Sequence, residues 1–368
     1  MPSVDVYPLL REALFRLPAD RAHDLARLAL RFPAAFRWLG RLAQIRDPRL
    51  ATDLAGIRLT NPLGLAPGLD KDGDLLPSLQ HLGFGYVVIG SLTAEARAGN
   101  PRPRLVRYPD RRSIANSMGL PNQGVAAAVR RLQSRPIRHT VVMASVAGFS
   151  GEEIVAGVAA LAPHVAAVEV GLICPNTSES ERMRELELVG ELVRELGRRR
   201  QRPVFVKLPP HHSPEERARV LAMVDLCIGA GIDGVSVNGG RSVLEPALAV
   251  GRGSLAGRDT FADARRIVGE IADHVRGRLL VRASGGVFTG DDAAAMLRAG
   301  ATTVEVYSAF VYEGWRVAER INRRLLELLD QDRLESVAGW RPAARAGVAA
   351  SRTPLAPPVT AAGRPMAP

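Results

Sequence analysis

Two lysines are set apart in this 368-residue chain, because the other 47 of its 49 basic residues are arginine. Lys207 ends the apolar run at 204–206, and Lys71 lies in a glycine-rich loop at 68–73 that follows the apolar run at 63–66. Lysine is a compact charge on a flexible stem that can approach a ring or share a proton, whereas arginine is a wide, always-charged fork. We therefore expect both ammonium groups to serve a reactive site. The alternative is that two lysines survived by chance a compositional drift toward arginine.

Four asparagines in predicted loops form a second group of candidates: Asn116, Asn122, Asn176 and Asn238. An amide offers donors and an acceptor without charge, which suits the flat, imide-like edge of a heterocycle. A single loop asparagine is more often a turn residue. Four of them on one side of a domain favour contact with a ligand.

The two cysteines, Cys174 and Cys227, cannot form a disulfide scaffold, and neither lies in a CxxC pair. Cys227 falls in a predicted helix, where we expect a buried thiol. Cys174 precedes Pro-Asn in a loop, where it could act as a general base or nucleophile if positive charge lowers its pKa. The histidines show no metal-ligand spacing, so we expect no metal, and we interpret His211 and His212 as surface residues.

Glycines and hydroxyl residues follow two late apolar runs. Ser284-Gly285-Gly286-Val287 follows one run, and Tyr307-Ser308 follows the next. In a barrel of alternating strands and helices, such positions after the last two strands are the usual site for a cofactor phosphate. A Gly-Gly pair elsewhere would be weak evidence.

Near-continuous apolar runs alternate with amphipathic segments from about residue 55 onward, which predicts a parallel sheet covered by helices. Their number, without an intervening linker, favours one closed (β/α)8 TIM barrel over two doubly wound halves. Reactive residues of such a barrel project from the carboxyl ends of its strands. The expected strands are 86–89, 141–145, 167–170, 204–207, 234–237, 279–282 and 303–306, and the expected helices include 181–199, 214–229, 261–274 and 291–298.

The barrel is expected over residues 49–330, between two segments of different character. Residues 1–48 predict a short helical extension whose apolar positions are interleaved with arginines, nine of them against five acids up to Arg49. The extension is either a structural cap on the barrel or a basic amphipathic surface that meets a bilayer. Residues 331–368 are rich in Ala, Pro, Arg and Gly and predict a disordered tail.

Hydrophobic residues make up 46% of the chain, enough for a substantial core. No run reaches the roughly 20 apolar residues of a membrane span, and the N-terminus lacks the apolar middle of a signal peptide. The formal net charge of +11 is spread along the chain, without zinc-finger spacing or an RNP-like strand, so we expect no nucleic-acid partner. An anionic membrane or small anionic substrate fits better. We expect a cytoplasmic protein, peripheral on the cytoplasmic side of the cell membrane.

The chemistry-bearing residues together resemble the dihydroorotate dehydrogenases, FMN-dependent (β/α)8 barrels of pyrimidine (UMP) synthesis. The resemblance covers about residues 5 to 328, and the N-terminal segment is similar to the extension of the membrane-associated, quinone-reducing class, where it forms an apolar tunnel for the quinone. The motifs that carry the resemblance are Asn61-Pro62-Leu63-Gly64-Leu65-Ala66, Gly68-Leu69-Asp70-Lys71-Asp72-Gly73, Gly83-Phe84-Gly85, Pro103-Arg104-Leu105, Asn116-Ser117-Met118-Gly119, Cys174-Pro175-Asn176-Thr177, Lys207, Asn238, Leu255-Ala256-Gly257-Arg258, Gly285-Gly286 and Tyr307-Ser308.

The resemblance implies oxidation of dihydroorotate to orotate, with Cys174 as the base, Lys207 beside the flavin ring, and electrons passed to a quinone. The positions it implies for FMN are Pro67, Gly68, Lys71, Ser91, Ser145, Gly171, Lys207, Val237, Gly257, Gly286, Tyr307 and Ser308. Those it implies for substrate are Lys71, Asn116, Ser117, Met118, Gly119, Leu120, Asn176, Asn238 and Gly239.

Four features depart from the family pattern. Cys174 stands where the quinone class has serine, and residues 145–150 likewise read more like the soluble class. Gly171 stands where the family has an asparagine, and Asn238-Gly239-Gly240 lacks the usual hydroxyl. Loss of a buried amide would cost about 1 to 3 kcal/mol and change which ring is accepted. Two alternatives therefore stay open: an FMN barrel that acts on another heterocycle or is inactive, and a non-redox lyase that uses Lys207 as a Schiff base.

Overall fold

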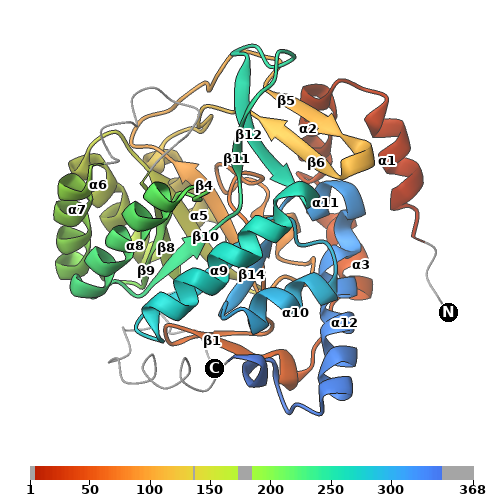
Figure 1. Cartoon of the computed structure of the whole chain (residues 1–368). Coiled ribbons are helices and arrows are strands. Elements are labelled where there is room, and N and C mark those ends of the chain that lie inside the picture. The colour runs from red at the N-terminus through yellow and green to blue at the C-terminus, as the bar shows by residue number, and fades with distance from the viewer. Residues whose placement is uncertain (1–4, 136, 173–184, 342–368) are drawn as a thin grey trace.

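Eight parallel strands close into a barrel in the computed structural model, which describes residues 5–135, 137–172 and 185–341 (Figure 1). The (β/α)8 fold expected from the sequence is confirmed, and the apolar run at 63–66 supplies the strand missing from the expected set. In order round the barrel, with the last next to the first, the strands are β3 (Leu63–Leu65), β4 (Tyr86–Leu92), β7 (Val141–Ala147), β8 (Ala167–Gly171), β9 (Val204–Lys207), β10 (Gly234–Val237), β13 (Leu280–Ser284) and β14 (Thr303–Val306).

Helices surround this barrel and return the chain to the start of the next strand (Figure 1). Two of them begin with a capping box, at Ser213 with Glu216 and at Thr289 with Asp292, so each starts at a defined residue after its strand. The helices that follow the strands are α4 (Leu76–Leu79), α5 (Val125–Ser134), α6 (Gly151–Leu161), α7 (Leu186–Arg199), α8 (Pro214–Gly229), α9 (Phe261–Val275), α10 (Gly290–Arg298), α11 (Ser308–Glu313) and α12 (Val317–Asp332).

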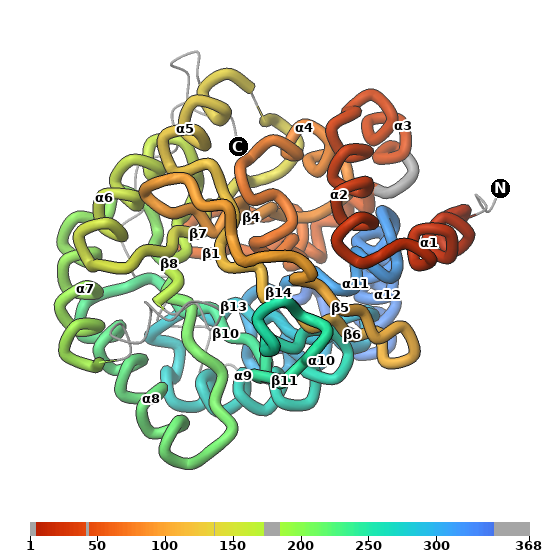
Figure 2. Tube along the Cα trace, turned by 90° about the horizontal axis from the view of Figure 1, so that it is seen from above, coloured from red at the N-terminus to blue at the C-terminus, as the bar shows by residue number. Residues whose placement is uncertain are grey.

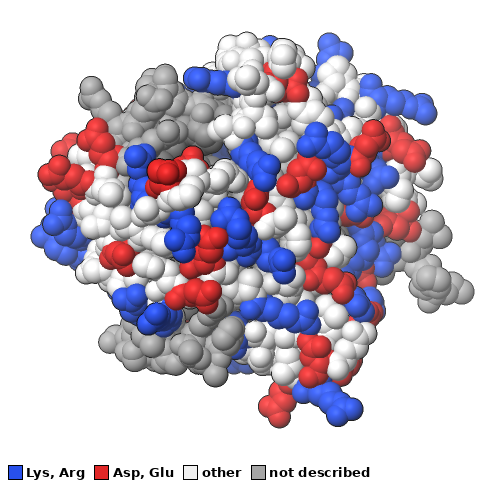
Figure 3. All heavy atoms as spheres, in the orientation of Figure 1, with Lys and Arg blue, Asp and Glu red and all other residues white. Residues whose placement is uncertain are grey.

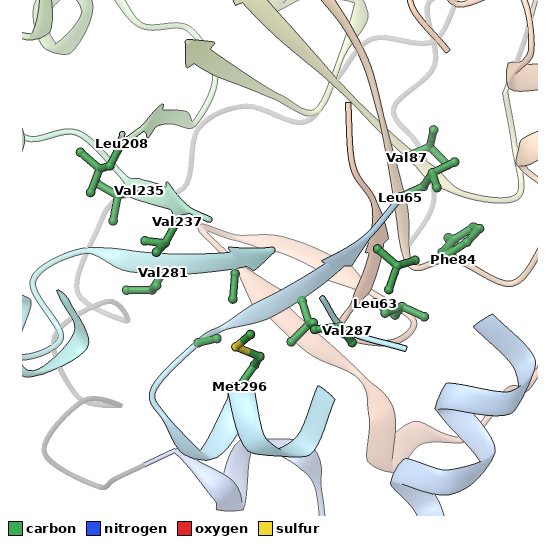
Figure 4. Close-up of a cluster of buried hydrophobic side chains, with 14 of the residues drawn as sticks. Leu63, Leu65, Phe84, Val87, Leu208, Val235, Val237, Val281, Val287 and Met296 are labelled. Carbon is green, nitrogen blue, oxygen red and sulfur yellow. The ribbon is translucent and has the colours of Figure 1, made fainter. Parts of the chain in front are cut away.

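The main core lies between the barrel strands and these helices. Figure 4 shows Val235 and Val281 on the neighbouring strands β10 and β13 and Met296 on α10, and all three are buried. A second buried cluster inside the barrel includes Tyr86 and Phe205. Gly64 makes room for it, because a Cβ at that position would lie 2.2 Å from the Tyr86 ring. The short antiparallel hairpin of β1 (Thr52–Leu54) and β2 (Ile57–Leu59) adds Leu54 and Leu59 to the same cluster.

A four-stranded antiparallel sheet, which the sequence did not lead us to expect, lies across the carboxyl ends of the barrel strands. Its order is β11 (Arg241–Leu244), β12 (Arg252–Gly257), β6 (Ser113–Asn116) and β5 (Leu105–Tyr108). Ladder pairs such as Leu255 with Ala115 join segments far apart in the sequence. Figure 1 shows β5, β6, β11 and β12 together at the top of the view.

The N-terminal extension forms three helices on one side of the barrel (Figure 2). They are α1 (Tyr7–Phe15), α2 (Ala19–Ala29) and α3 (Pro33–Ala43). Asp20 accepts the backbone N–H of Arg104, and Arg27 forms an ion pair with Asp74 at 3.1 Å. The Tyr7 hydroxyl donates to the carbonyl of Val311. The extension is thus attached to the barrel by buried or half-buried bonds. In the described part of the chain, no helix has the length and apolar character needed to cross a bilayer.

The C-terminal segment differs in part from the expected tail. Residues 331–341 are described, and they end α12 and form a short 3-10 helix, η7 (Val337–Trp340). Val337 and Trp340 are buried, and the Trp340 indole donates to Asp332 at 2.7 Å. These apolar side chains hold residues 331–341 on the barrel, whereas residues 342–368 lie outside the described ranges.

On the face shown in Figure 3, basic and acidic side chains are interspersed.

Candidate active site

A cavity of about 520 Å³ opens at the carboxyl ends of the barrel strands, beneath the antiparallel sheet. Loop residues after β3 and strand-end residues of β9 and β14 form its wall, and β6 and β12 cover it. Of the residues expected to bind flavin or substrate, those that line it are Pro67, Gly68, Lys71, Ser91, Asn116, Met118, Gly119, Leu120, Gly171, Lys207, Asn238, Gly257, Gly286, Tyr307 and Ser308.

Other expected site residues lie outside this lining. Ser145 stands behind Ser91, with the two hydroxyls 2.8 Å apart, and Gly239 packs against α9, where a Cβ would lie 2.6 Å from the Ala264 nitrogen. Val237 and Ser117 are buried and likewise do not line the cavity. Cys174 and Asn176, expected as base and substrate ligand, lie outside the described residues.

Lys71 is held by the loop that follows β3. The carboxylate of Asp70 accepts the backbone N–H groups of Gly73 and Leu75, which fixes the loop. Lys71 Nζ donates to the carbonyl of Gly68 at 2.8 Å, and the residue is only 9% exposed. Burial, together with the positive charges of Arg27 and Arg104, lowers the pKa of Lys71 to about 7. This ammonium is therefore short of counter-charge and suited to receive an anion.

Lys207 ends β9 and reaches the same cavity from another strand. Its Nζ lies 3.9 Å from a carboxylate oxygen of Glu169, which is fully buried in the barrel. The register places Lys207 beside Gly171 of β8 and beside Ser236 of β10. A Cβ at Gly171 would be 3.6 Å from the Val146 carbonyl, an ordinary contact, so this position has room for a side chain.

The expected asparagines separate into two groups. Asn116 and Asn238 line the cavity, with their amides donating to the carbonyls of Ser254 and Leu208. Asn122 instead uses its amide to bond Thr93, Leu120 and Gly124, and does not line this cavity. Asn122 stabilises a turn with all its polar atoms and lines a second, smaller cavity, so ligand contact at Asn122 stays a prediction.

Backbone of unusual conformation brings main-chain groups close to the cavity. Gly257 and Gly286 have φ of +106° and +69°, in the region that favours glycine. A Cβ would lie 2.5 Å from the Arg112 carbonyl at Gly257 and 2.7 Å from the Phe261 nitrogen at Gly286. Gly257 and Gly286 thus border the cavity without a side chain of their own. Ser308 borders the same cavity at the start of α11.

Charged residues inside the barrel were missed at the sequence level. Glu169, Arg282 and Glu305 are at most 3% exposed, and Glu305 also lines the cavity. The available signal was a charged residue in the middle of each of three apolar strands, Val168-Glu169-Val170, Val281-Arg282-Ala283 and Val304-Glu305-Val306.

A smaller cavity of about 200 Å³ lies between α2 and the loops of the barrel, and it shares Lys71 and Met118 with the main cavity. His23 of α2 lines it, and burial together with the charges of Lys71 and Arg27 lowers the pKa of His23 to about 3. The imidazole is therefore neutral at physiological pH. The extension thus contributes residues to the neighbourhood of the active site.

Cys227 and His211 are both buried, although only the cysteine was expected to be. Cys227 is buried as expected, and burial raises the pKa of its thiol to about 12. The surface interpretation holds for His212 but is wrong for His211, which is 1% exposed with its Nε2 3.0 Å from Glu270. The contact of His211 with Glu270 and the bond from the Arg266 guanidinium to the His211 carbonyl hold this loop on α9. Within the described ranges, no group of three or more His, Cys, Asp or Glu residues is placed to hold a metal.

Comparison with known proteins gives consistent matches over most of the chain. The family model described as dihydroorotate dehydrogenase matches residues 49–329. The chain is 35% identical over 349 residues to a dihydroorotate dehydrogenase (quinone) of Roseiflexus sp. (strain RS-1), covering 90% of this chain and 96% of that protein. It is 35% identical over 341 residues to a protein of the same name from Cereibacter sphaeroides (strain KD131 / KCTC 12085), covering 89% and 94%. Its fold is similar to the crystal structure of DHODH from Eimeria tenella in complex with ferulenol, with a TM-score of 0.75, 25% identity, and coverage of 90% and 96%.

Proposed function

The chain belongs to the dihydroorotate dehydrogenase family, and from that premise we propose that it binds FMN at the strand ends of its barrel and holds dihydroorotate with Lys71, Asn116 and Asn238. The enzyme is flavin-dependent and oxidises dihydroorotate to orotate in pyrimidine synthesis, with a quinone as electron acceptor. The observation that carries the site assignment is that both lysines of the chain line one cavity.

The cavity residues fit a flavin mononucleotide. Gly257 and Gly286 are packed so closely against neighbouring backbone that neither has room for a Cβ, and both border the cavity, where main-chain groups can approach a phosphate. Ser308 and Tyr307 border the same part of the cavity, and Lys207 and Ser91 lie at the ends of two other barrel strands. Gly257, Gly286, Tyr307 and Ser308 would hold the phosphate. Lys207 and Ser91 would contact the ring. When bound, the flavin supplies the acceptor for a hydride, which is two electrons with one proton.

The chain's own residues would bind and orient the substrate and remove a proton. The Lys71 ammonium would pair with the carboxylate of dihydroorotate, and the amides of Asn116 and Asn238 would face its imide edge. Oxidation of the ring breaks two C–H bonds and forms one C=C bond. One hydrogen leaves as a hydride and the other as a proton, which the thiolate of Cys174 would accept.

Anaerobic mixing of the purified protein with L-dihydroorotate tests this function directly. We expect the flavin absorbance to bleach in wild type, because the substrate reduces the bound flavin. Cys174→Ala should keep its flavin but fail to bleach. A protein purified without flavin would overturn the cofactor assignment and favour a non-redox reaction at Lys207. Unchanged bleaching in Cys174→Ala would remove Cys174 from the base role.

We propose that the quinone approaches through the smaller cavity between α2 and the barrel. It meets the main cavity at Lys71, Met118 and Pro121. Its lining is mostly charged or polar, with neutral His23 beside Asp24 and Arg27, so it would suit the polar ring of the quinone and not its apolar tail. The outer surface of the extension carries apolar side chains that are more than half exposed, among them Leu9, Leu28, Phe32 and Trp38. Such a surface, interleaved with arginines, fits peripheral contact with an anionic bilayer that holds the quinone.

The membrane contact can be tested without disturbing the site. Phe32 and Trp38 are 63% and 64% exposed, so the double variant Phe32→Ser/Trp38→Ser should fold normally. We expect it to lose binding to vesicles that contain anionic lipid and to reduce membrane-held quinone more slowly, while dihydroorotate still bleaches its flavin at the wild-type rate. Wild-type vesicle binding would make the extension a structural cap only. Leu186→Ser, at an exposed leucine of α7, is the matched control.

A further inference from the structure

A layer of paired charges closes the barrel immediately below the active-site cavity. Glu169 of β8, Arg282 of β13 and Glu305 of β14 project into the barrel and are 0%, 1% and 3% exposed. We name these three residues the charged floor. Glu305 borders the cavity, and Glu169 lies two residues before Gly171, which also borders it. The floor is therefore the first layer beneath the residues that would hold the flavin.

The members of the floor bond to one another and to residues of the cavity. A carboxylate oxygen of Glu169 lies 3.9 Å from Lys207 Nζ, and the other lies 3.5 Å from an Arg282 guanidinium nitrogen. Arg282 also forms a short ion pair with Glu305, which accepts the Tyr86 hydroxyl at 3.1 Å. Ion pairs thus link Lys207 through Glu169 and Arg282 to Glu305, and the contact between Glu169 and Arg282 is an ion pair without a hydrogen bond.

The hydroxyl of Ser145 links the floor to the cavity by a second route. It donates to Glu169 at 3.1 Å and lies 2.8 Å from the hydroxyl of Ser91, which lines the cavity. Burial alone would raise the pKa of Glu169, but the charges of Lys207 and Arg282 and the hydroxyls of Ser236 and Ser145 outweigh it and hold that pKa below its ordinary value. The Glu169 carboxylate is therefore ionised beneath the site.

Three buried charges are unusual inside a barrel, where branched apolar side chains normally fill the layers. The attraction within a buried ion pair offsets little more than the free energy needed to remove its charges from water, and apolar residues of similar volume would stabilise the fold as well or better. Stability alone thus gives no reason for three buried charges at this depth. Their position beneath a redox cofactor site does give a reason, because charges interact strongly through a medium of low dielectric and would therefore affect the charge of the cofactor.

We propose that the charged floor sets the reduction potential of the flavin, with Glu169 as the buried counter-ion that offsets the positive charge of Lys207. Among the described residues of the floor and its contacts, two positive groups, Lys207 and Arg282, face two negative groups, Glu169 and Glu305, so the formal charges cancel. The inference rests on the proposed function, since it needs a flavin in the cavity. Removal of one carboxylate leaves one uncompensated positive charge, which favours the more negative, reduced flavin.

The midpoint potential of the bound flavin tests the proposal, measured by spectroelectrochemistry on the holoenzyme. Glu169→Gln keeps the size of the side chain and removes its charge. We expect its equilibrium constant for two-electron reduction to rise about tenfold or more, which is a potential raised by about 30 mV. Glu305→Gln makes the same charge change on the other side of Arg282 and should also raise the potential, so it replaces Glu169→Gln should that variant fail to fold.

Tyr86→Phe is the matched control, because it removes a buried hydrogen bond to Glu305 and changes no charge. We expect a lower melting temperature with a wild-type potential. The proposal is overturned if the glutamine variants bind flavin at the wild-type potential, or if Tyr86→Phe shifts the potential as far as they do. A wild-type protein that binds no flavin would instead overturn the proposed function, so the two failures are distinct.

Discussion

Lys71 and Lys207 face the same cavity from opposite electrostatic surroundings. Lys71 is 9% exposed, and burial with the charges of Arg27 and Arg104 lowers its pKa to about 7. The Lys207 side chain is 36% exposed and lies 3.9 Å from the ionised Glu169. Neighbouring charges, not residue type, therefore decide whether an ammonium still needs a counter-charge. Lys71 is prepared to receive an anion, whereas Lys207 already has one.

Loss of the Lys71 charge should have the largest effect. With Lys71→Met, we expect kcat/KM for dihydroorotate to fall about 10²- to 10³-fold, because one partner of a buried charge pair is removed. Lys71→Arg should not restore activity, since the wide guanidinium does not fit the enclosed position. Stopped-flow flavin reduction measures the change. If both variants keep the wild-type kcat/KM, the substrate carboxylate does not bind at Lys71.

The lowered pKa of Lys71 predicts how substrate binding depends on pH. The free lysine loses its proton as pH rises through about 7, and an anionic substrate binds the protonated form, so binding takes up a proton above pH 7 and none below. We expect the apparent affinity to be level below pH 7 and to fall about tenfold per pH unit above it.

Titration of Asp70 has to be separated from this effect, because burial and the charge of Asp74 also raise the pKa of Asp70 to about 7. The pH dependence of flavin reduction at low substrate concentration should lose its alkaline fall in Lys71→Met. If the alkaline fall in the rate of flavin reduction persists in Lys71→Met, that fall belongs to the titration of Asp70.

Arg27 tests the role of neighbouring charge more finely. Arg27→Met removes one of the positive charges that lower the pKa of Lys71, so the alkaline fall should move upward by about half a pH unit to one unit. Arg31→Met is the matched control, because Arg31 pairs with the same Asp74 but is more than half exposed. Equal shifts in both variants would show that the ion pairs of Asp74, not the charge near Lys71, set the pH dependence.

Gly171 lies beside Lys207 in the barrel and should give the smallest effect. A Cβ there meets only ordinary contacts, at 3.6 Å to the Val146 carbonyl and 3.9 Å to Ala147 Cβ, so Gly171→Asn should fold. We expect the added amide to tighten dihydroorotate binding by about 1 kcal/mol, roughly fivefold. Gly171→Ala adds the same Cβ without the amide. If the asparagine variant binds no better than the alanine variant, the cavity recognises its substrate without this amide.

Much of the barrel could be predicted from local sequence. Continuous apolar runs between helices indicate buried parallel strands, and the expected ranges coincide closely with β4, β7, β9, β10 and β14. Motif resemblance likewise named the family that the comparisons support. The antiparallel sheet was missed because its short, partly exposed strands have little pattern of their own and pair across more than a hundred residues, as Leu255 does with Ala115.

Local sequence marks the residue types that carry the chemistry: two lysines in a chain of arginines, loop asparagines, and glycines after the late strands. Their surroundings follow from the tertiary structure, because closure of the barrel sets which charges meet. Glu169 and Arg282 are 113 positions apart, and no local pattern pairs them, yet their side chains lie 3.5 Å apart. Asn122 and His211 show the same limit, since their partners are assigned by packing. Electrostatic environment is a property of the fold, and it separates Lys71 from Lys207.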